Sequence, residues 1–129
     1  MATISYNDSI LSSIKKLMPG SSIPEEYTIF DDELILDINT ELAILSQIGV
    51  GKLDSVFVIT GTGELWSDFI DDPELLSLVP SYIAHRVKMV FDPPKSSIVM
   101  EQLKDKSKEL EFRIMDGAWR HRRRQEGKL

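Results

Sequence analysis

Few side chains in this sequence have the types and spacing that catalysis or metal binding needs. The two histidines, His85 and His121, lie far apart, and no third ligand-type residue forms a recognisable metal pattern with them. The absence of cysteine removes disulfides, thiol nucleophiles and cysteine-based zinc sites. We expect no metal, no cofactor and no catalytic residue, and we expect His85 to be an ordinary hydrogen-bonded or partly exposed histidine.

Two acidic pairs and two glycine pairs imitate functional motifs without completing them. The pairs Asp31-Asp32 and Asp71-Asp72 each stand directly before a predicted helix, where capping explains them better than acid catalysis. The segments Gly49-Val50-Gly51 and Gly61-Thr62-Gly63 lack the lysine and hydroxyl residue that complete a phosphate-binding loop. We interpret them as turns and predict that the protein is not an enzyme.

The most pointed feature is the basic run at residues 120–124. Residues 1–112 hold 9 Lys and Arg against 19 Asp and Glu, a net charge of -10, whereas residues 113–129 hold 6 against 2, a net of +4. Two interpretations stay open: a solvated end, or a contact with an acidic partner or with DNA phosphates. The candidate partner-binding residues are Arg120, Arg122, Arg123 and Arg124. Without a sequence-reading motif, any DNA contact should be transient, nonspecific and salt-sensitive.

The elements that must position these residues are mostly helices of one domain, as the length of 129 residues suggests. Apolar residues at helical spacing predict a first helix from Ser9, with Asn7 or Asp8 as its cap and Pro19-Gly20 as its stop. A loop over 21–29 follows. The second helix should open on the acids at 31–33 and end at Gly49.

Two further helices complete the prediction. Asp72-Pro73 caps and opens the third, whose buried stripe is Leu75, Leu76, Val79, Ile83, Val87 and Val90. Pro80 should bend this helix or delay its regular start. The last helix is capped by Ser96 or Ser97, with Met100, Leu103, Ser107, Leu110 and Ile114 along one side.

A short β-hairpin at about 55–66 is expected between the second and third helices. Val56 to Thr60 is rich in β-branched residues, and a glycine turn separates it from Glu64-Leu65-Trp66. Two strands alone are marginal, so the hairpin should pack on helices or on another subunit. The subunit-interface candidates are Val56, Phe57, Val58, Ile59 and Trp66. Trp66 and Phe69 also suit the local core, with Asp68 capping the turn between them.

The fold class is therefore mainly α, a bundle of about four helices with one short hairpin. The helical domain should cover residues 1–116, because Gly117 weakens helical continuation, and residues 117–129 should be a basic, flexible tail. No apolar run reaches the roughly 20 residues that span a bilayer, and the start lacks a signal-peptide pattern. We expect no membrane contact and synthesis in the cytoplasm.

Four residue groups in this order resemble the head-tail connector family of tailed bacteriophages over roughly residues 9–115. They are Leu11 to Leu17, Gln47-Ile48-Gly49-Val50-Gly51, Trp66-Ser67-Asp68-Phe69-Ile70 and Phe91-Asp92-Pro93-Pro94. The most specific part is the Trp-x-Asp-Phe segment followed about twenty residues later by Phe-Asp-Pro-Pro. The resemblance implies structural roles for nine residues of these motifs: Gly49, Gly51, Trp66, Asp68, Phe69, Phe91, Asp92, Pro93 and Pro94.

The resemblance implies assembly rather than catalysis. A member of this family is expected to form a homo-oligomeric ring, dodecameric here, that docks on the portal protein after DNA packaging and extends the DNA channel. It would sit at the head-tail interface of the virion and meet a downstream neck or tail-completion protein. Its terminal helix and tail, here the residues after Leu110, would contact the portal. Two alternatives stay open: another neck or tail-completion protein, and a nonspecific DNA-binding protein using the arginine-rich end.

Overall fold

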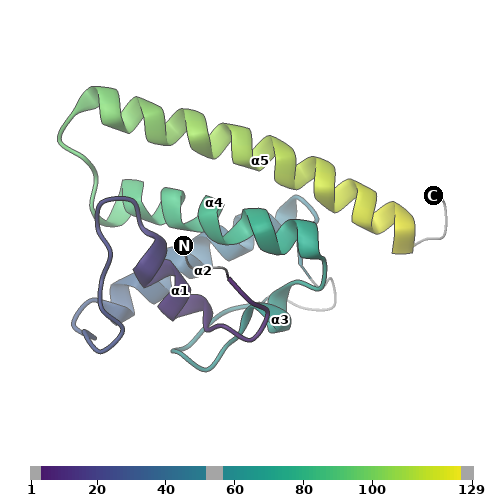
Figure 1. Cartoon of the computed structure of the whole chain (residues 1–129), viewed down its shortest axis with the longest axis horizontal. Helices are drawn as coiled ribbons and strands as arrows, with labels where there is room; N and C mark the ends of the chain where they lie inside the picture. Colours follow the sequence, from purple (N-terminus) through teal and green to yellow (C-terminus); the bar gives the residue numbers. More distant parts are fainter. Residues whose placement is uncertain (1–3, 52–56, 126–129) are drawn as a thin grey trace.

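The computed structural model describes residues 4–51 and 57–125, and this part of the chain is mainly helical, as predicted. Its helices are α1 Ile10–Leu17, α2 Asp31–Gln47, α3 Trp66–Phe69, α4 Pro73–Phe91 and α5 Ser97–Gln125. In Figure 1, α4 runs through the middle, α5 crosses one side of it, and α1, α2 and α3 lie on the other side. No helix in the described ranges is long and apolar enough to cross a membrane.

The predicted cap is right at one acidic pair and wrong at the other. Phe30 precedes α2 without a side-chain cap, and Asp31 pairs with Lys15 instead. The Asp72 carboxylate accepts a hydrogen bond from the Leu75 amide at 3.1 Å, so Asp72 caps α4 and Pro73 opens it. The helix runs unbroken through Pro80, so its regular start is not delayed. The cap of α1 is Ser9, whose Oγ accepts from the Ser12 amide at 3.2 Å; the prediction of Asn7 or Asp8 is wrong. Asp8 instead accepts from the Ser5 amide.

The glycines after α2 are required by backbone geometry. Gly49 and Gly51 have φ values of +91° and +97°, in the region that L side chains rarely adopt. A Cβ atom at Gly51 would also lie 2.6 Å from Cε1 of Phe69. The Gly49-Val50-Gly51 turn therefore packs against Phe69 of α3.

The predicted β-hairpin is wrong for the described residues, because both of its strands satisfy their backbone groups elsewhere. The Asn39 side chain bonds the N–H and the C=O of Ile59, at 2.8 and 3.0 Å. The Glu64 carboxylate accepts from the amides of Thr60 and Gly61, and the segment after it bonds residues 6–10 instead. A single antiparallel bridge between Ser9 and Leu65 remains, and Trp66 starts the short helix α3.

The core lies where α1, α2, α3 and α4 meet. Trp66 is fully buried, and its indole N–H donates to Ser13 Oγ at 3.0 Å. The predicted α4 stripe is buried at Leu75, Val79, Ile83 and Val87 and partly buried at Leu76. It is wrong at Val90, which is 66% exposed along an open groove between α4 and α5.

The last helix does not stop at residue 116, although the sequence predicted that Gly117 would weaken its continuation. α5 continues through Gly117 to Gln125, and Ala118 is buried with Ile114. A Cβ atom at Gly117 would lie 2.7 Å from the Glu74 carboxylate, so glycine here permits close approach to α4. Contacts between helices outweigh the low helix propensity of glycine. Residues 126–129 lie outside the described ranges.

A buried cation fixes the loop between α1 and α2. The Lys15 side chain is 1% exposed, and its ammonium group donates to the carbonyl groups of Glu25 and Tyr27 and to the Asp31 carboxylate. The three donors of the ammonium group are thus all used. This arrangement holds the loop before α2 onto α1.

Candidate functional site

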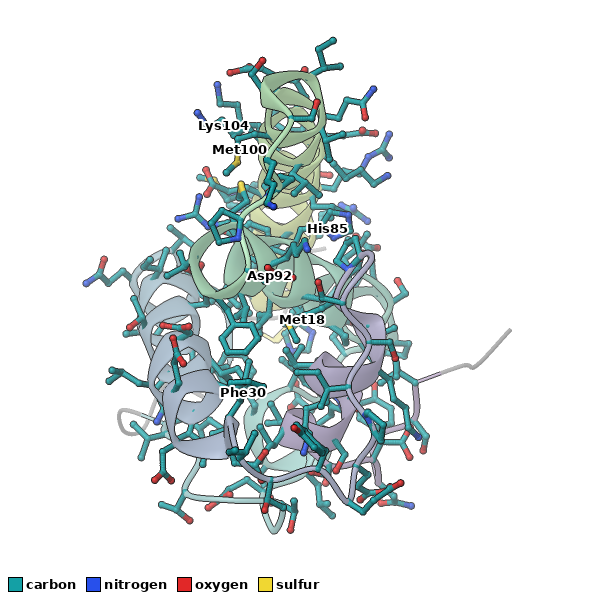
Figure 2. The ribbon with its side chains drawn as sticks, turned by 90° about the vertical axis from the view of Figure 1, so that its left-hand side faces the viewer. Met18, Phe30, His85, Asp92, Met100 and Lys104 are labelled. Carbon is teal, nitrogen blue, oxygen red and sulfur yellow. The ribbon has the colours of Figure 1, made fainter. Side chains whose placement is uncertain are left out.

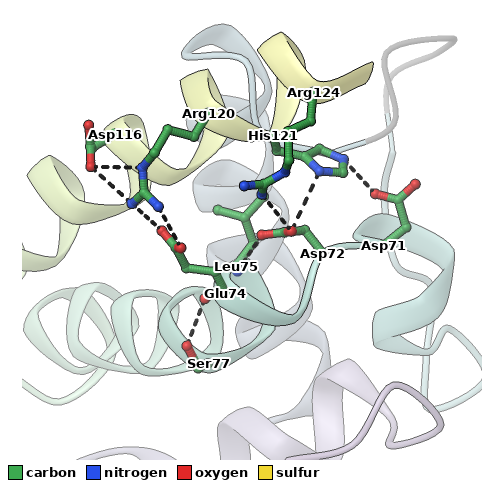
Figure 3. Close-up of polar contacts among 9 residues, drawn as sticks. All are labelled: Asp71, Asp72, Glu74, Leu75, Ser77, Asp116, Arg120, His121 and Arg124. Carbon is green, nitrogen blue, oxygen red and sulfur yellow. Dashed lines mark hydrogen bonds and ion pairs between the residues drawn. The ribbon is translucent and has the colours of Figure 1, made fainter. Parts of the chain in front are cut away.

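The basic run of the sequence lies on the last turns of α5 and faces the acidic junction before α4. Figure 3 shows Arg120, His121 and Arg124 reaching from α5 toward Asp71, Asp72 and Glu74. We name these six residues the latch. Because Asp72 caps α4, the position of its carboxylate is set by the helix that it starts.

Arg120 makes the most extensive contact of the latch. Its guanidinium group donates to both oxygens of Glu74, at 2.9 and 2.5 Å, and to the Asp116 carboxylate one turn earlier on α5. Such two-pronged contact matches the planar geometry of arginine. The hydrogen bonds to Glu74, followed by those to Asp116, raise the pKa of Arg120 above its ordinary value.

His121 and Arg124 converge on the two aspartates. The His121 ring places Nε2 3.0 Å from Asp71 and Nδ1 3.5 Å from Asp72. A guanidinium nitrogen of Arg124 lies 3.4 Å from the same oxygen of Asp72. The Asp72 side chain, only 8% exposed, therefore caps α4 with one oxygen and faces α5 with the other.

The remaining two arginines have no carboxylate partner within the described residues. Arg122 is exposed and donates to the Gly49 carbonyl oxygen at 3.2 Å. The guanidinium carbon of Arg123 lies 5.2 Å from the centre of the Trp119 ring, a cation–π contact. The four predicted partner-binding arginines thus differ: Arg120 and Arg124 are paired within the chain, whereas Arg122 and Arg123 keep charge available to a partner.

The predicted interface residues of the hairpin are not brought together on the surface. Trp66 and Ile59 are buried in the chain's own core, so neither presents a surface to a second subunit. Phe57 stacks on Phe69 with ring centres 5.4 Å apart. Val58 is 49% exposed, and Val56 lies outside the described residues.

The other residues that carried the resemblance to connectors have structural roles. The Asp68 carboxylate accepts from the Leu65 amide at 2.9 Å at the start of α3. Asp92 accepts from Ser21 Oγ and from the Lys88 ammonium group, and these two bonds lower the pKa of its carboxyl group. Phe91 meets Phe30 edge-to-face, and Pro93-Pro94 lie in the turn before α5. These motifs hold the ends of helices together.

Sequence reasoning missed an exposed apolar stripe on α5. Phe112, Met115 and Trp119 are 75%, 46% and 55% exposed and follow at spacings of three and four residues. That spacing puts them on one side of a helix, and it would have revealed them had α5 been extended past residue 116. They lie beside the latch, on the outer side of the same helix segment.

The two histidines lie in different surroundings, His121 in the latch and His85 on α4. Nδ1 of His85 lies 2.7 Å from the Ser81 carbonyl oxygen, one turn earlier on α4, so this nitrogen is the donor. Within residues 4–51 and 57–125, no three His, Cys, Asp or Glu side chains are grouped to hold a metal ion. The latch is a set of polar contacts between the end of α5 and the start of α4, with ion pairs at Arg120 and Arg124.

Comparison with known proteins gives a match to a protein family. A family model described as phage connector protein matches residues 10–118, which include α1 to α4 and most of α5. No curated protein and no solved structure gives a significant match. The family match covers most of the 129 residues. The chain therefore belongs to the phage connector protein family.

Proposed function

We propose that this structural protein of the phage head-tail connector is one subunit of a ring that docks on the portal protein. In this proposal the ring assembles after DNA packaging and continues the DNA channel toward the tail. The observation that carries the proposal is the connector-family match over residues 10–118. Such a protein works by contacts with the other head and tail proteins of the virion, without a reaction of its own.

The C-terminal part of α5 is the proposed portal-docking element. It carries Arg122 and Arg123, which have no carboxylate partner in the described part of the chain and can pair with acidic groups on the portal. Arg120 and Arg124 could join them only by exchanging Glu74 and Asp72 for groups of the portal. We therefore assign docking first to Arg122 and Arg123.

A function as a nonspecific DNA-binding protein receives less support. Three carboxylates, Asp72, Glu74 and Asp116, lie among the arginines and repel phosphate where the basic run would have to touch it. The net charge of -6 opposes binding along a duplex as well. We place transient DNA contact inside the channel of the assembled ring, where an acidic lining would let DNA slide.

Binding of the purified protein to portal assemblies tests the proposal, with sedimentation for stoichiometry and electron microscopy for position. We expect a ring on the outer end of the portal. The double variant Arg122→Ala/Arg123→Ala should weaken binding at least tenfold, about 1.4 kcal/mol, and leave the latch intact. The matched control is Lys104→Ala/Lys108→Ala, which removes two exposed cations elsewhere on α5.

Two results would redirect the assignment. If the intact protein does not bind portal assemblies, the proposed docking is wrong. A role as another neck or tail component would then be favoured. If the arginine variant and the lysine control weaken binding equally and binding depends steeply on salt, general charge attraction replaces a docking site.

A further inference from the structure

The C-terminal half of α5 presents an apolar face that stays largely exposed to solvent. This α5 stripe consists of Phe112, Met115 and Trp119 and is about 11 Å long at 1.5 Å per residue. A turn of 100° per residue places it on the side of α5 away from the buried Ile114 and Ala118. Charges of both signs lie beside it: the exposed Arg113 pairs with Glu109, and the exposed Asp116 pairs with Arg120. Arg123 lies over Trp119 and has no carboxylate partner within the described residues, so the uncompensated charge at the edge of the stripe is basic.

A second apolar surface lies at the start of α2. This entry patch consists of the exposed Tyr27, Ile29 and Phe30. The Phe30 ring lies 6.2 Å from Tyr27 and 5.4 Å from Phe91, and the patch borders a hollow of about 440 Å³ lined in part by Ile23 and Phe91. Figure 2 faces this end and shows Phe30 between α1 and α2, with Asp92 at the end of α4.

The entry patch has an acidic edge. Glu26, Asp32 and Glu33 are exposed around it, and none of them forms an ion pair within the described ranges. Glu25 is exposed as well and accepts a hydrogen bond from Ser12. Acidic and aromatic groups thus share this surface.

The two surfaces complement each other better than either complements itself. Two copies joined through their α5 stripes would bring arginines together, and two joined through their entry patches would bring carboxylates together; like charges disfavour both. Joining a stripe to an entry patch brings apolar groups together with opposite charges around them. Aromatic, methionine and arginine residues are also the types enriched at interfaces.

We propose that the α5 stripe of one subunit docks on the entry patch of a second copy of this chain, with Trp119 packing toward the hollow beside Phe30. Figure 1 shows the C-terminal end of α5 and the loop before α2 at opposite ends of the molecule. Such a head-to-tail contact leaves one α5 stripe and one entry patch of each pair unoccupied. Further copies can therefore add until a ring closes. This inference deepens the proposed ring and assigns its subunit contact.

Cross-linking between two kinds of chain tests the pairing directly. The sequence has no cysteine, so Ile29→Cys in one tagged chain and Met115→Cys in a differently tagged chain are the only thiols. A short flexible bis-maleimide should join position 29 of one chain to position 115 of another far more often than 29 to 29 or 115 to 115. Equal yields of all three products, or no cross-linked chains at any soluble concentration, would overturn the proposal.

Sedimentation of variants without portal gives the second measurement. Trp119→Ala should weaken self-association about thirtyfold or more, the effect of a central interface tryptophan, and Glu26→Arg/Asp32→Arg should weaken it as well. Mixing these two variants should restore pairs that cannot grow further, because each keeps one intact surface. The control Ile98→Ala removes another exposed apolar side chain of α5, about 21 Å from Phe112, and should change nothing.

Portal binding, measured separately, distinguishes this inference from the proposed function. Self-association that persists in Trp119→Ala while portal binding is lost would assign the stripe to the portal and overturn the subunit contact. Portal binding that is absent in every variant, with the cross-links intact, would leave the subunit contact standing and defeat the proposed docking.

Discussion

Two polar anchors hold this fold together, and they differ in burial. Lys15 is 1% exposed and binds the loop before α2 through three acceptors, whereas Arg120 is 39% exposed and binds Glu74 across two helices. Breaking a buried pair leaves uncompensated polar groups in a poorly solvated place, whereas water replaces the partner of an exposed arginine. The first anchor should therefore contribute more to the stability of the fold than the second.

The largest expected effect follows from removing the buried anchor. Lys15→Ala should lower the free energy of unfolding by about 3 to 5 kcal/mol, because two carbonyl groups and the Asp31 carboxylate lose their donor. Denaturant unfolding measures the loss. Lys16→Ala, on the exposed side of the same helix, is the control and should be nearly neutral. An equal effect at the two lysines would remove the distinction between the anchors.

The next effect concerns Asp72, which belongs to both a helix cap and the latch. Asp72→Ala should destabilise the protein by about 1 kcal/mol more than Asp72→Asn, because asparagine can still accept the hydrogen bond from the Leu75 amide. Both variants lose the carboxylate that faces Arg124 and His121. Thermal unfolding separates the two roles. If the two variants are equally unstable, the charge outweighs the cap.

A smaller and more local effect is expected at Arg120. Arg120→Ala should speed amide hydrogen exchange in the last turns of α5 several-fold, because Glu74 and Asp116 lose their shared partner, and should leave exchange in the core unchanged. Arg113→Ala is the matched control, since Arg113 pairs with Glu109 on its own helix. Faster exchange throughout the protein would show that the latch is as important to the fold as Lys15.

The smallest effect is expected at Asp37 and depends on pH. Burial, and then the nearby charge of Glu33, raise the pKa of Asp37, and its Oδ2 has no hydrogen-bond partner. The folded state thus holds the proton more tightly than the unfolded state, so stability falls as the pH rises from the ordinary pKa of about 3.9.

The variant Asp37→Asn has no carboxyl group at this position, so its stability should not fall through ionisation there. It should be more stable than the natural chain at pH 7, by less than about 1 kcal/mol because the group is partly exposed, and similar to it near pH 3. Unfolding at both pH values tests the difference. A gain that is the same at pH 3 and pH 7 would rule out ionisation as its cause.

Helix-forming patterns were readable along the chain, whereas pairings between distant segments were not. Asp72 caps α4, and Gly49 follows the end of α2. Both signals involve residues close in sequence, so residue spacing predicted them. The expected hairpin failed because Asn39 and residues 6–10 took the hydrogen bonds that its strands would have exchanged. The residue pattern of 56–66 alone cannot predict those distant hydrogen-bond partners.

The end of α5 shows the same division. Its basic run was visible in the sequence, but the pairing of Arg120 and Arg124 with Glu74 and Asp72 joins residues 46 and 52 positions apart. Gly117 was expected to weaken the helix, and instead its missing side chain lets α5 approach α4. The latch and the outward direction of Trp119 could therefore appear only once the helices were packed.

The sequence by itself determined the mainly helical class, most helix ends, the turn glycines and the resemblance to connectors, because these depend on short-range periodicity, capping and motif order. Only the tertiary structure decided that Trp66 is core, that two of the four arginines are paired, and that Phe112, Met115 and Trp119 stay exposed. Those properties depend on which distant groups lie within contact distance, and chain folding alone establishes that.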